Sequence, residues 1–261
     1  MKNPVRFVGA GPGDPELITV KGMRFLQEAD RVVYTGSLVP ETLLNFCKKD
    51  VKVYDSASLT LEQTHALLKE GYDARECVVR LHTGDPSLYG AINEQIELLE
   101  RDEIAYEVAP GVSAAFAAAA AMKQELTIPE ICQTVILTRL GGRTSVPEKE
   151  KLAALASHRA TLVIYLSVQR IEEVVTQLRA HYAADTPAIV AYRVSWPDQK
   201  LIWGTLENIA GKVQAENISR QAVILVGEVF KAKGPAGEPA KRSRLYDETF
   251  GHQFRDAATK Q

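Results

Sequence analysis

Three glycine-containing loops carry the residue types that could hold a small ligand. The first, residues 9–14, reads Gly-Ala-Gly-Pro-Gly-Asp and directly follows an apolar run of strand length. The second occupies residues 83–90 and the third residues 110–114. Glycine lets the backbone approach a ligand closely, and carboxylates such as Asp14 and Asp85 tolerate a cation. The loops therefore predict a site for an uncharged or cationic ligand; the alternative is that they are tight turns.

The first loop differs from a dinucleotide-binding loop. The G-x-G-x-x-G pattern requires glycine at position 14, where this chain has Asp14. Pro12 removes one backbone N–H from a loop that would have to donate to a pyrophosphate. Nicotinamide and flavin enzymes are therefore disfavoured. No G-x-x-x-x-G-K-[ST] sequence is present, so the chain has no P-loop motif.

Other kinds of catalytic centre have little support. The five histidines show no spacing typical of metal ligands, and no C-x-x-C or G-x-S-x-G sequence occurs. We interpret the histidines as ordinary packed or surface residues. We expect no metal site and assign no catalytic residue.

Alternating strand and helix patterns must position these loops. Strands are predicted at 5–9, 31–35, 51–54, 77–82 and 105–109. Helices are predicted between them, at 20–29, 40–48, 60–71 and 89–101. This alternation predicts a mainly parallel sheet covered by helices. Ligands of such sheets lie beyond the carboxyl ends of the strands, which is where the three loops occur.

A second series of elements begins near residue 133. It predicts strands at 134–138, 161–166, 188–194, 200–203 and 222–230. Helices are predicted at 148–157, 168–182 and 205–216, and an Ala-rich helix lies in the join at 111–130. The close succession of strand signals within 199–230 indicates antiparallel pairing there.

The expected fold class is α/β, with two αβα domains and a cofactor cleft between them. We predict an N-terminal domain at residues 1–113 and a C-terminal domain at 114–230. Residues 231–261 form a charged tail with few apolar residues, a composition that favours disorder. Docking of Leu245, Tyr246 and Phe250 on a domain is the alternative.

The bulk composition sets limits on partners and compartment. The formal net charge is −2, so no global basic field favours nucleic acid as a partner. The three cysteines are scattered, which favours a reducing compartment over a disulfide framework. Strand residues follow the first methionine almost at once, and no apolar run reaches membrane-spanning length. We expect a cytoplasmic protein with no membrane partner.

The three loops, in this order, resemble the tetrapyrrole methylase family. Residues 8–22 are similar to its N-terminal signature, and Gly84-Asp85-Pro86 and Pro110-Gly111-Val112-Ser113 to its cofactor loops. The resemblance covers roughly residues 4–230. It is closest to the subgroup acting at C11 of precorrin-4 or cobalt-precorrin-4. The stretches similar to that subgroup are 34–39, 133–139, 142–144, 146–148 and 192–198.

The resemblance implies methyl transfer from S-adenosylmethionine to C11 of the tetrapyrrole, in cobalamin biosynthesis, by a homodimer. S-adenosylhomocysteine would be the product. The residues implied in cofactor binding are Pro12, Gly84, Asp85, Leu88, Ser113 and Ala114, with Leu166, Val194 and Ala222 as an apolar adenine pocket. The alternatives are methylation at C2, C20 or C17, an RNA or protein methylase, and a non-enzymatic binding module.

One departure from the family pattern weakens the C2 alternative. The C2/C7 methylases carry an Asp after the Tyr of the second strand and a Lys in the loop after the third, both with proton-transfer roles. In this chain Thr35 follows Tyr34, and the aligned stretch 54–58 contains no Lys. Those catalytic roles therefore do not transfer to this sequence.

A polycarboxylated tetrapyrrole requires cations around its rim. Arg139, Arg143 and Arg193 follow or end predicted strands of the second half, and guanidinium groups match carboxylates bidentately. We predict that these arginines bind the substrate; the alternative is that they are solvated surface charges. Tyr34, Tyr89 and Tyr192 are candidates for stacking or hydrogen bonding to it, with core packing as their alternative.

Overall fold

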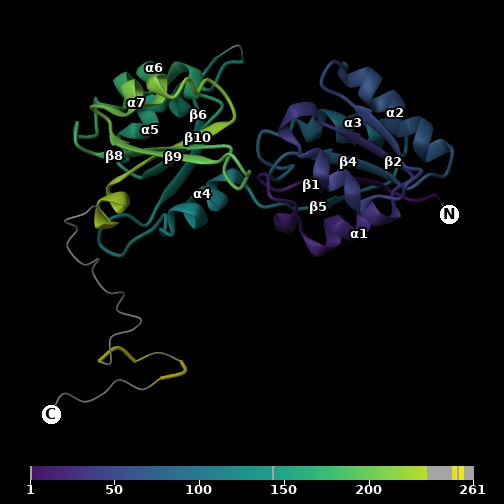
Figure 1. Cartoon of the computed structure of the whole chain (residues 1–261), viewed down its shortest axis with the longest axis horizontal. Helices are drawn as coiled ribbons and strands as arrows, with labels where there is room; N and C mark the ends of the chain where they lie inside the picture. Colours follow the sequence, from purple (N-terminus) through teal and green to yellow (C-terminus); the bar gives the residue numbers. More distant parts are fainter. Residues whose placement is uncertain (1, 143, 234–248, 252, 256–261) are drawn as a thin grey trace. The chain divides into compact units, whose positions relative to one another are not determined.

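The computed structural model describes residues 2–142, 144–233, 249–251 and 253–255 (Figure 1). Contacts within the chain define two compact units. The first unit is Met1–Ala118 together with Arg193–Gln199, and the second is Ala119–Tyr192 together with Lys200–Gln261. The domain boundary expected between residues 113 and 114 stays a prediction.

The first unit contains a five-stranded sheet. Its strands are β1 (Val5–Gly9), β2 (Arg31–Tyr34), β3 (Lys52–Asp55), β4 (Val78–His82) and β5 (Tyr106–Ala109). They lie in the order β3-β2-β4-β1-β5, and every pair is parallel. The predicted parallel sheet is therefore confirmed for this unit. Because all five strands run the same way, their carboxyl ends share one edge.

Helices cover both faces of this sheet. They are α1 (Val20–Glu28), α2 (Leu61–Asp73) and α3 (Ile92–Arg101), with short 3₁₀ turns at Pro15–Leu17, Gly36–Leu38 and Glu41–Phe46. Figure 1 shows α2 and α3 on one face and α1 on the other. The N-terminus of α2 is capped reciprocally, since Thr60 Oγ1 accepts from the Gln63 amide and Gln63 Oε1 accepts from the Thr60 amide.

The predicted α-helix at 40–48 is wrong. The segment forms only the six-residue 3₁₀ helix Glu41–Phe46, in which the Leu43 amide donates to the Pro40 carbonyl at 3.1 Å. Leu43 is fully buried in the core of the first unit. The end of this segment, Asn45-Phe46-Cys47, has low helix propensity, so the 3₁₀ turn does not propagate into an α-helix.

The second unit contains a mixed five-stranded sheet. Its strands are β6 (Val135–Arg139), β7 (Thr161–Tyr165), β8 (Pro187–Tyr192), β9 (Lys200–Thr205) and β10 (Ala222–Val226), in the order β6-β7-β10-β8-β9. Only β6 and β7 pair in parallel, while β10 runs antiparallel to both of its neighbours and β8 antiparallel to β9. The antiparallel pairing expected within 199–230 is confirmed. The strand expected at 222–230 is too long, because a 3₁₀ helix, Glu228–Lys233, follows β10.

Three short helices cover one face of the second sheet. They are α5 (Leu152–Ala156), α6 (Ile171–Leu178) and α7 (Ile209–Ala215), with 3₁₀ turns at Glu148–Glu150 and Val168–Arg170. A fourth helix, α4 (Ala114–Met122), is the Ala-rich helix expected in the join between the two series. Buried side chains of α5, α6, α7 and the sheet form one core. Figure 1 shows these three helices on the upper side of the sheet.

Most of the expected tail lies outside the described residues, including Leu245 and Tyr246. Phe250 is described and is 42% exposed. Within the described ranges, no helix combines the length and apolar character needed to cross a lipid bilayer.

Candidate functional site

The three predicted loops meet at the carboxyl edge of the first sheet. They follow β1, β4 and β5, which are adjacent in the order β4-β1-β5. The Gly84 amide donates to the Gly11 carbonyl at 2.8 Å, and the Gly11 amide donates to the Gly84 carbonyl at 3.2 Å. The Gly111 amide donates to Asp85 Oδ2 at 2.9 Å. Hydrogen bonds therefore join the first loop to the second and the second to the third.

Three glycines form the point of closest approach, which we call the glycine seam: Gly9, Gly84 and Gly111. A Cβ atom on Gly9 would lie 2.6 Å from Gly111 Cα, and one on Gly111 would lie 2.1 Å from the Gly84 carbonyl oxygen. Gly84 has a φ of +59°, in the left-handed region that glycine adopts without strain. The seam therefore excludes side chains, and the three loops meet backbone to backbone.

Asp85 braces the second loop against the third. Its Oδ1 accepts from the Ser87 amide at 2.8 Å and from the Ser87 hydroxyl, while Oδ2 accepts from Gly111. Partial burial raises the pKa of Asp85, but the hydrogen bonds from Ser87 and Gly111 outweigh that effect, so the net pKa is lowered. Asp85 is consequently an anion at neutral pH, fixed in place by three donors.

The other predicted residues of these loops differ in their contacts and in their exposure to solvent. The Pro12 carbonyl accepts a hydrogen bond from Trp196 Nε1 at 2.9 Å. Leu88 is half-buried, and Tyr89 is 42% exposed with a φ of +56°. The Ser113 carbonyl accepts from the amides of the first turn of α4, which begins at Ala114. The structure therefore brings all the cofactor residues predicted between Pro12 and Ala114 to one edge of one sheet.

One polar group near this edge, the hydroxyl of Thr35, was not assigned a role from the sequence, and it adjoins the substrate candidate Tyr34. Thr35 follows β2, and its hydroxyl is buried without a hydrogen-bond partner among the described residues. Tyr34, directly before it, is half-buried, and its pKa is raised by burial and then by the nearby carboxylates Asp55 and Glu41. A buried hydroxyl without a partner is unusual, because it normally costs free energy.

His82 ends β4, directly before the second loop. Its ring is 3% exposed and stacks on Phe7 with the ring centroids 5.9 Å apart. Burial, reinforced by the nearby Arg80 cation, lowers the pKa of His82 to about 3. The imidazole is therefore neutral at physiological pH and belongs to the packed layer beneath the loops.

The buried imidazole should make the protein sensitive to acid. Its pKa falls from an ordinary value of 6.5 to about 3 on folding, so the stabilisation is complete above pH 6.5 and is lost as the pH falls toward 3. This linkage predicts a loss of about 2 kcal/mol in unfolding free energy between pH 7.5 and pH 5. His82→Phe keeps an aromatic ring on Phe7 but cannot be protonated. Urea unfolding at both pH values should show a shallower pH dependence for the variant, and equal pH dependences would contradict this assignment.

In the second unit, two of the predicted adenine-pocket residues lie at one end of the sheet. Ala222 begins β10 and pairs with Tyr192 at the end of β8, while Leu166 directly follows β7 on the other side of β10. Leu166 is 62% exposed and has a φ of +52°, an unfavourable conformation for a branched apolar residue. The third residue, Val194, is 4% exposed and lies in the segment of 193–199 that groups with the first unit.

Two of the predicted substrate arginines, Arg139 and Arg193, are engaged in contacts within their own loops. Arg139 donates to the carbonyls of Thr144 at 3.2 Å and Ser145 at 3.1 Å. Arg193 forms an ion pair with Asp198 at 2.9 Å. Arg143 lies outside the described residues. Tyr192 packs against the core of the second unit. The substrate role of these residues stays a prediction.

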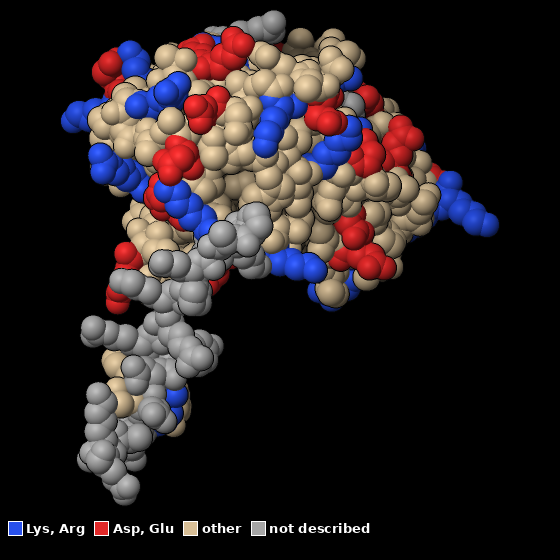
Figure 2. All heavy atoms as spheres, turned by 60° about the vertical axis from the view of Figure 1, so that its left-hand side comes forward, with Lys and Arg blue, Asp and Glu red and all other residues tan. Residues whose placement is uncertain are grey.

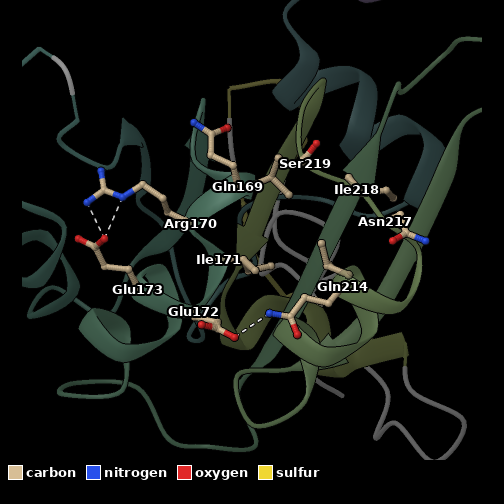
Figure 3. A pocket seen from close by; sticks show the side chains of 11 residues that line it. Gln169, Arg170, Ile171, Glu172, Glu173, Gln214, Asn217, Ile218 and Ser219 are labelled. Carbon is tan, nitrogen blue, oxygen red and sulfur yellow. Dashed lines mark hydrogen bonds and ion pairs between the residues drawn. The ribbon is translucent and has the colours of Figure 1, made fainter.

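A separate pocket of about 560 Å³ lies in the second unit (Figure 3). It is lined by residues of the 168–170 turn, the start of α6, and the end of α7 with the segment after it. Across it, Gln214 Nε2 donates to Glu172 Oε1 at 2.6 Å, and beside it Arg170 pairs with Glu173. None of the residues predicted from the sequence lines this pocket. The loop site and this pocket are therefore composed of different residues.

Charges of both signs are interspersed on the face of the molecule shown in Figure 2. No extended field of one sign covers that face, in agreement with the formal net charge of −2. A site for an anionic substrate must therefore be built from particular arginines or lysines and not from a general basic surface.

Comparisons with known proteins show matches over most of the chain. A sequence model of the Tetrapyrrole (Corrin/Porphyrin) Methylases matches residues 4–210. A precorrin-4 C(11)-methyltransferase of Pseudomonas aeruginosa is 49% identical over 251 residues, which is 96% of this chain and 98% of that protein.

Two solved structures are also similar. The X-ray structure of a cobalamin biosynthetic enzyme, cobalt precorrin-4 methyltransferase, has a TM-score of 0.85 and 44% identity, covering 87% of this chain and 95% of that one. A uroporphyrin-III C-methyl transferase from Thermus thermophilus, solved in complex with S-adenosyl homocysteine, has a TM-score of 0.74 and 31% identity. That match covers 91% of this chain and 99% of the other.

Proposed function

The chain belongs to the tetrapyrrole methylase family, and from this premise we propose that it transfers a methyl group from S-adenosylmethionine to C11 of precorrin-4 or cobalt-precorrin-4. The observation that carries the proposal is the glycine seam braced by Asp85, because it joins the three loops that the family resemblance marks as cofactor loops. The high coverage of both chains in the comparisons supports the same activity.

The seam fits an S-adenosyl group. Any Cβ on Gly9 or Gly111 would collide with backbone, so these positions present only main chain to a ligand. The Asp85 carboxylate is held ionised and suits a cationic or hydroxyl-bearing ligand. The residues proposed to hold the cofactor are Pro12, Gly84, Asp85, Leu88, Ser113 and Ala114, with Leu166, Val194 and Ala222 around the adenine. When bound, S-adenosylmethionine supplies a methyl carbon activated by its positive sulfur.

The chain's own contribution is mainly orientation. Reactants held in a productive geometry save about 7–11 kcal/mol of the barrier relative to free reactants. The hydrogen bonds that fix Asp85 and the seam give the cofactor loops one conformation. We propose Arg139, Arg143 and Arg193 as the groups that bind the acetate and propionate side chains of the tetrapyrrole. Tyr34, Tyr89 and Tyr192 are proposed to contact the macrocycle.

The decisive experiment locates the new methyl group. Purified protein is incubated with precorrin-4 and S-adenosylmethionine labelled with ¹³C in the methyl group, and the product is examined by NMR. The proposal expects the label on C11. Label on C2, C17 or C20 would assign another tetrapyrrole methylation, and binding of both compounds without transfer would indicate a binding module. A parallel reaction with the cobalt complex of precorrin-4 decides whether the substrate carries the metal.

We also propose that the chain acts as a homodimer in the cytoplasm. One cross-strand row of the second sheet is apolar from edge to edge: Leu137, Val163, Leu225, Ile189 and Trp203. Its central members are fully buried, whereas Leu137 and Trp203 at the edges are 36% and 41% exposed. Exposed apolar edges of a buried row suit a subunit interface.

The cytoplasmic location is supported by the cysteines. All three are free thiols, which suits a reducing compartment.

The dimer proposal predicts that Leu137→Glu yields monomers. A charge on the exposed edge of the row should not disturb the buried residues. In a subunit interface, however, the Glu carboxylate would lose its hydration, which costs roughly several kcal/mol. Sedimentation velocity should give the mass of two chains for the wild type and of one chain for the variant. The exposed substitution Glu216→Gln, away from this row, is the control and should leave the dimer intact. A wild type that sediments as a monomer would refute the proposal.

A further inference from the structure

The 193–199 loop, residues Arg193–Gln199, has a closely specified conformation. The Trp196 amide donates to the Arg193 carbonyl at 2.9 Å, and the Gln199 amide donates to the Trp196 carbonyl at 3.1 Å. The Gln199 side chain in turn accepts from the Ser195 amide at 2.8 Å. Arg193 and Ser195 have φ values of +42° and +68°. Non-glycine residues remain in this region only where surrounding contacts hold them there.

This loop holds the first glycine loop at three consecutive residues. Trp196 Nε1 donates to the Pro12 carbonyl at 2.9 Å. The indole ring fills the space beside Gly13, where a Cβ atom would lie 2.1 Å from Trp196 Cδ1. The Asp14 amide donates to Ser195 Oγ at 2.9 Å. One donor, one ring and one acceptor therefore fix the backbone of residues 12–14.

The Trp196 indole also contacts the guanidinium of Arg193. The Arg193 guanidinium lies over the Trp196 ring at 4.1 Å from its centroid and is paired with Asp198 at 2.9 Å. A cation over an aromatic face is attracted by the ring's electron density. The ion pair and the ring contact together limit where Trp196 can move. The indole is thus constrained by its own loop as well as by the glycine loop that it contacts.

We propose that Trp196 is a positioning residue for the cofactor loop, acting through Pro12. Its Nε1–H and its ring set the place of the Pro12 and Gly13 backbone, and that placement sets the affinity for the S-adenosyl ligand. The inference rests on the proposed function, in which Pro12 contacts the cofactor. Gly13 is required because any side chain at that position would displace the indole. Trp196 does not itself touch the reacting atoms.

The first test is Trp196→Phe, which keeps an aromatic ring beside Gly13 and under Arg193 but removes the donor to Pro12. Losing one hydrogen bond should raise the dissociation constant for S-adenosylhomocysteine, measured by calorimetry, about two- to tenfold. The Michaelis constant for S-adenosylmethionine should rise by a similar factor, with kcat at saturating cofactor unchanged. Tyr106→Phe also removes one donor from an aromatic side chain, here to Glu100 Oε1 at 2.6 Å at the start of β5, and should leave the dissociation constant at the wild-type value.

The second test is a double-mutant cycle between residues 13 and 196. In the wild-type background, Gly13→Ala drives a methyl group into the indole and should weaken S-adenosylhomocysteine binding by more than Trp196→Phe does. In the Trp196→Ala background the space is vacant, so adding Gly13→Ala should change the affinity by less than about twofold. Because Gly13→Ala leaves Trp196 in place, it also tests the contact if Trp196→Phe does not fold.

The outcomes separate this inference from the proposed function. A wild type that binds S-adenosylhomocysteine while Trp196→Phe and Gly13→Ala bind it equally well would overturn the positioning role alone. Additive effects of Gly13→Ala and Trp196→Ala would do the same. A wild type that binds no S-adenosylhomocysteine would overturn the proposed function and the positioning role together. Reduced melting temperatures with unchanged affinities would show that the contact serves stability only.

Discussion

Gly111→Ala is expected to reduce the affinity for S-adenosylhomocysteine by about a hundredfold and to destabilise the fold by about 1–3 kcal/mol. The added Cβ would lie 2.1 Å from the Gly84 carbonyl oxygen and 2.8 Å from Gly9 Cα, and all of these neighbours are backbone. No flexible side chain can give way, so the loops themselves must separate. A displacement of about 1 Å in positioned groups is enough to cost about a hundredfold in function.

A matched control isolates the steric effect of the methyl group. Gly211 lies within α7, and a Cβ there would meet no atom within 4 Å. Gly211→Ala should therefore stabilise the protein by about 0.5–1 kcal/mol, since alanine favours helix more than glycine does. Calorimetric titration and urea unfolding of both variants provide the measurement. Wild-type ligand affinity in Gly111→Ala would show that the seam does not form part of the cofactor site.

Asp85→Ala is expected to weaken S-adenosylmethionine binding by about tenfold to a hundredfold, corresponding to about 1.5–3 kcal/mol for a charge-assisted interaction. The substitution removes the anion proposed to face the cofactor. It also leaves the Gly111 amide and the Ser87 amide without their acceptor. Some loss of stability should accompany the loss of affinity, and we expect the affinity to fall further than the stability does.

A second substitution separates charge from bracing. Asp85→Asn keeps the size of the side chain but removes the charge. If Asp85 attracts the sulfonium, Asp85→Asn should weaken the binding of S-adenosylmethionine more than that of S-adenosylhomocysteine, whose sulfur is uncharged. Calorimetry with both ligands measures the difference, and Asp50→Ala, an exposed carboxylate on the first unit, serves as the control. Equal losses for the two ligands would assign Asp85 to bracing alone.

The sequence by itself determined the local elements and the position of the three loops. Apolar runs of strand length alternating with amphipathic segments predicted β1 to β5 to within about two residues, because that periodicity reflects burial of each element against its immediate layer. Glycines at the end of β1 and two residues after the ends of β4 and β5 marked the loops. The parallel order of these strands then requires the loops to share one edge, as the structure confirms.

Interactions between distant segments were decided only by the tertiary structure. The sequence showed that Asp85 and Gly111 were in candidate loops, but not that one hydrogen bond joins them. It placed Arg139 and Arg193 near strand ends, but their partners at Thr144, Ser145 and Asp198 depend on the path of each loop.

Trp196 is the clearest case of a residue that only the folded chain explains. It lies 184 positions from Pro12 in the sequence, and nothing in the local pattern of either segment reports their contact. The insertion of β10 between β7 and β8 likewise follows from how the whole sheet packs. Local periodicity records which side of an element is buried, whereas pairing between remote segments is selected by the combined fit of backbone, rings and hydrogen bonds in the complete fold.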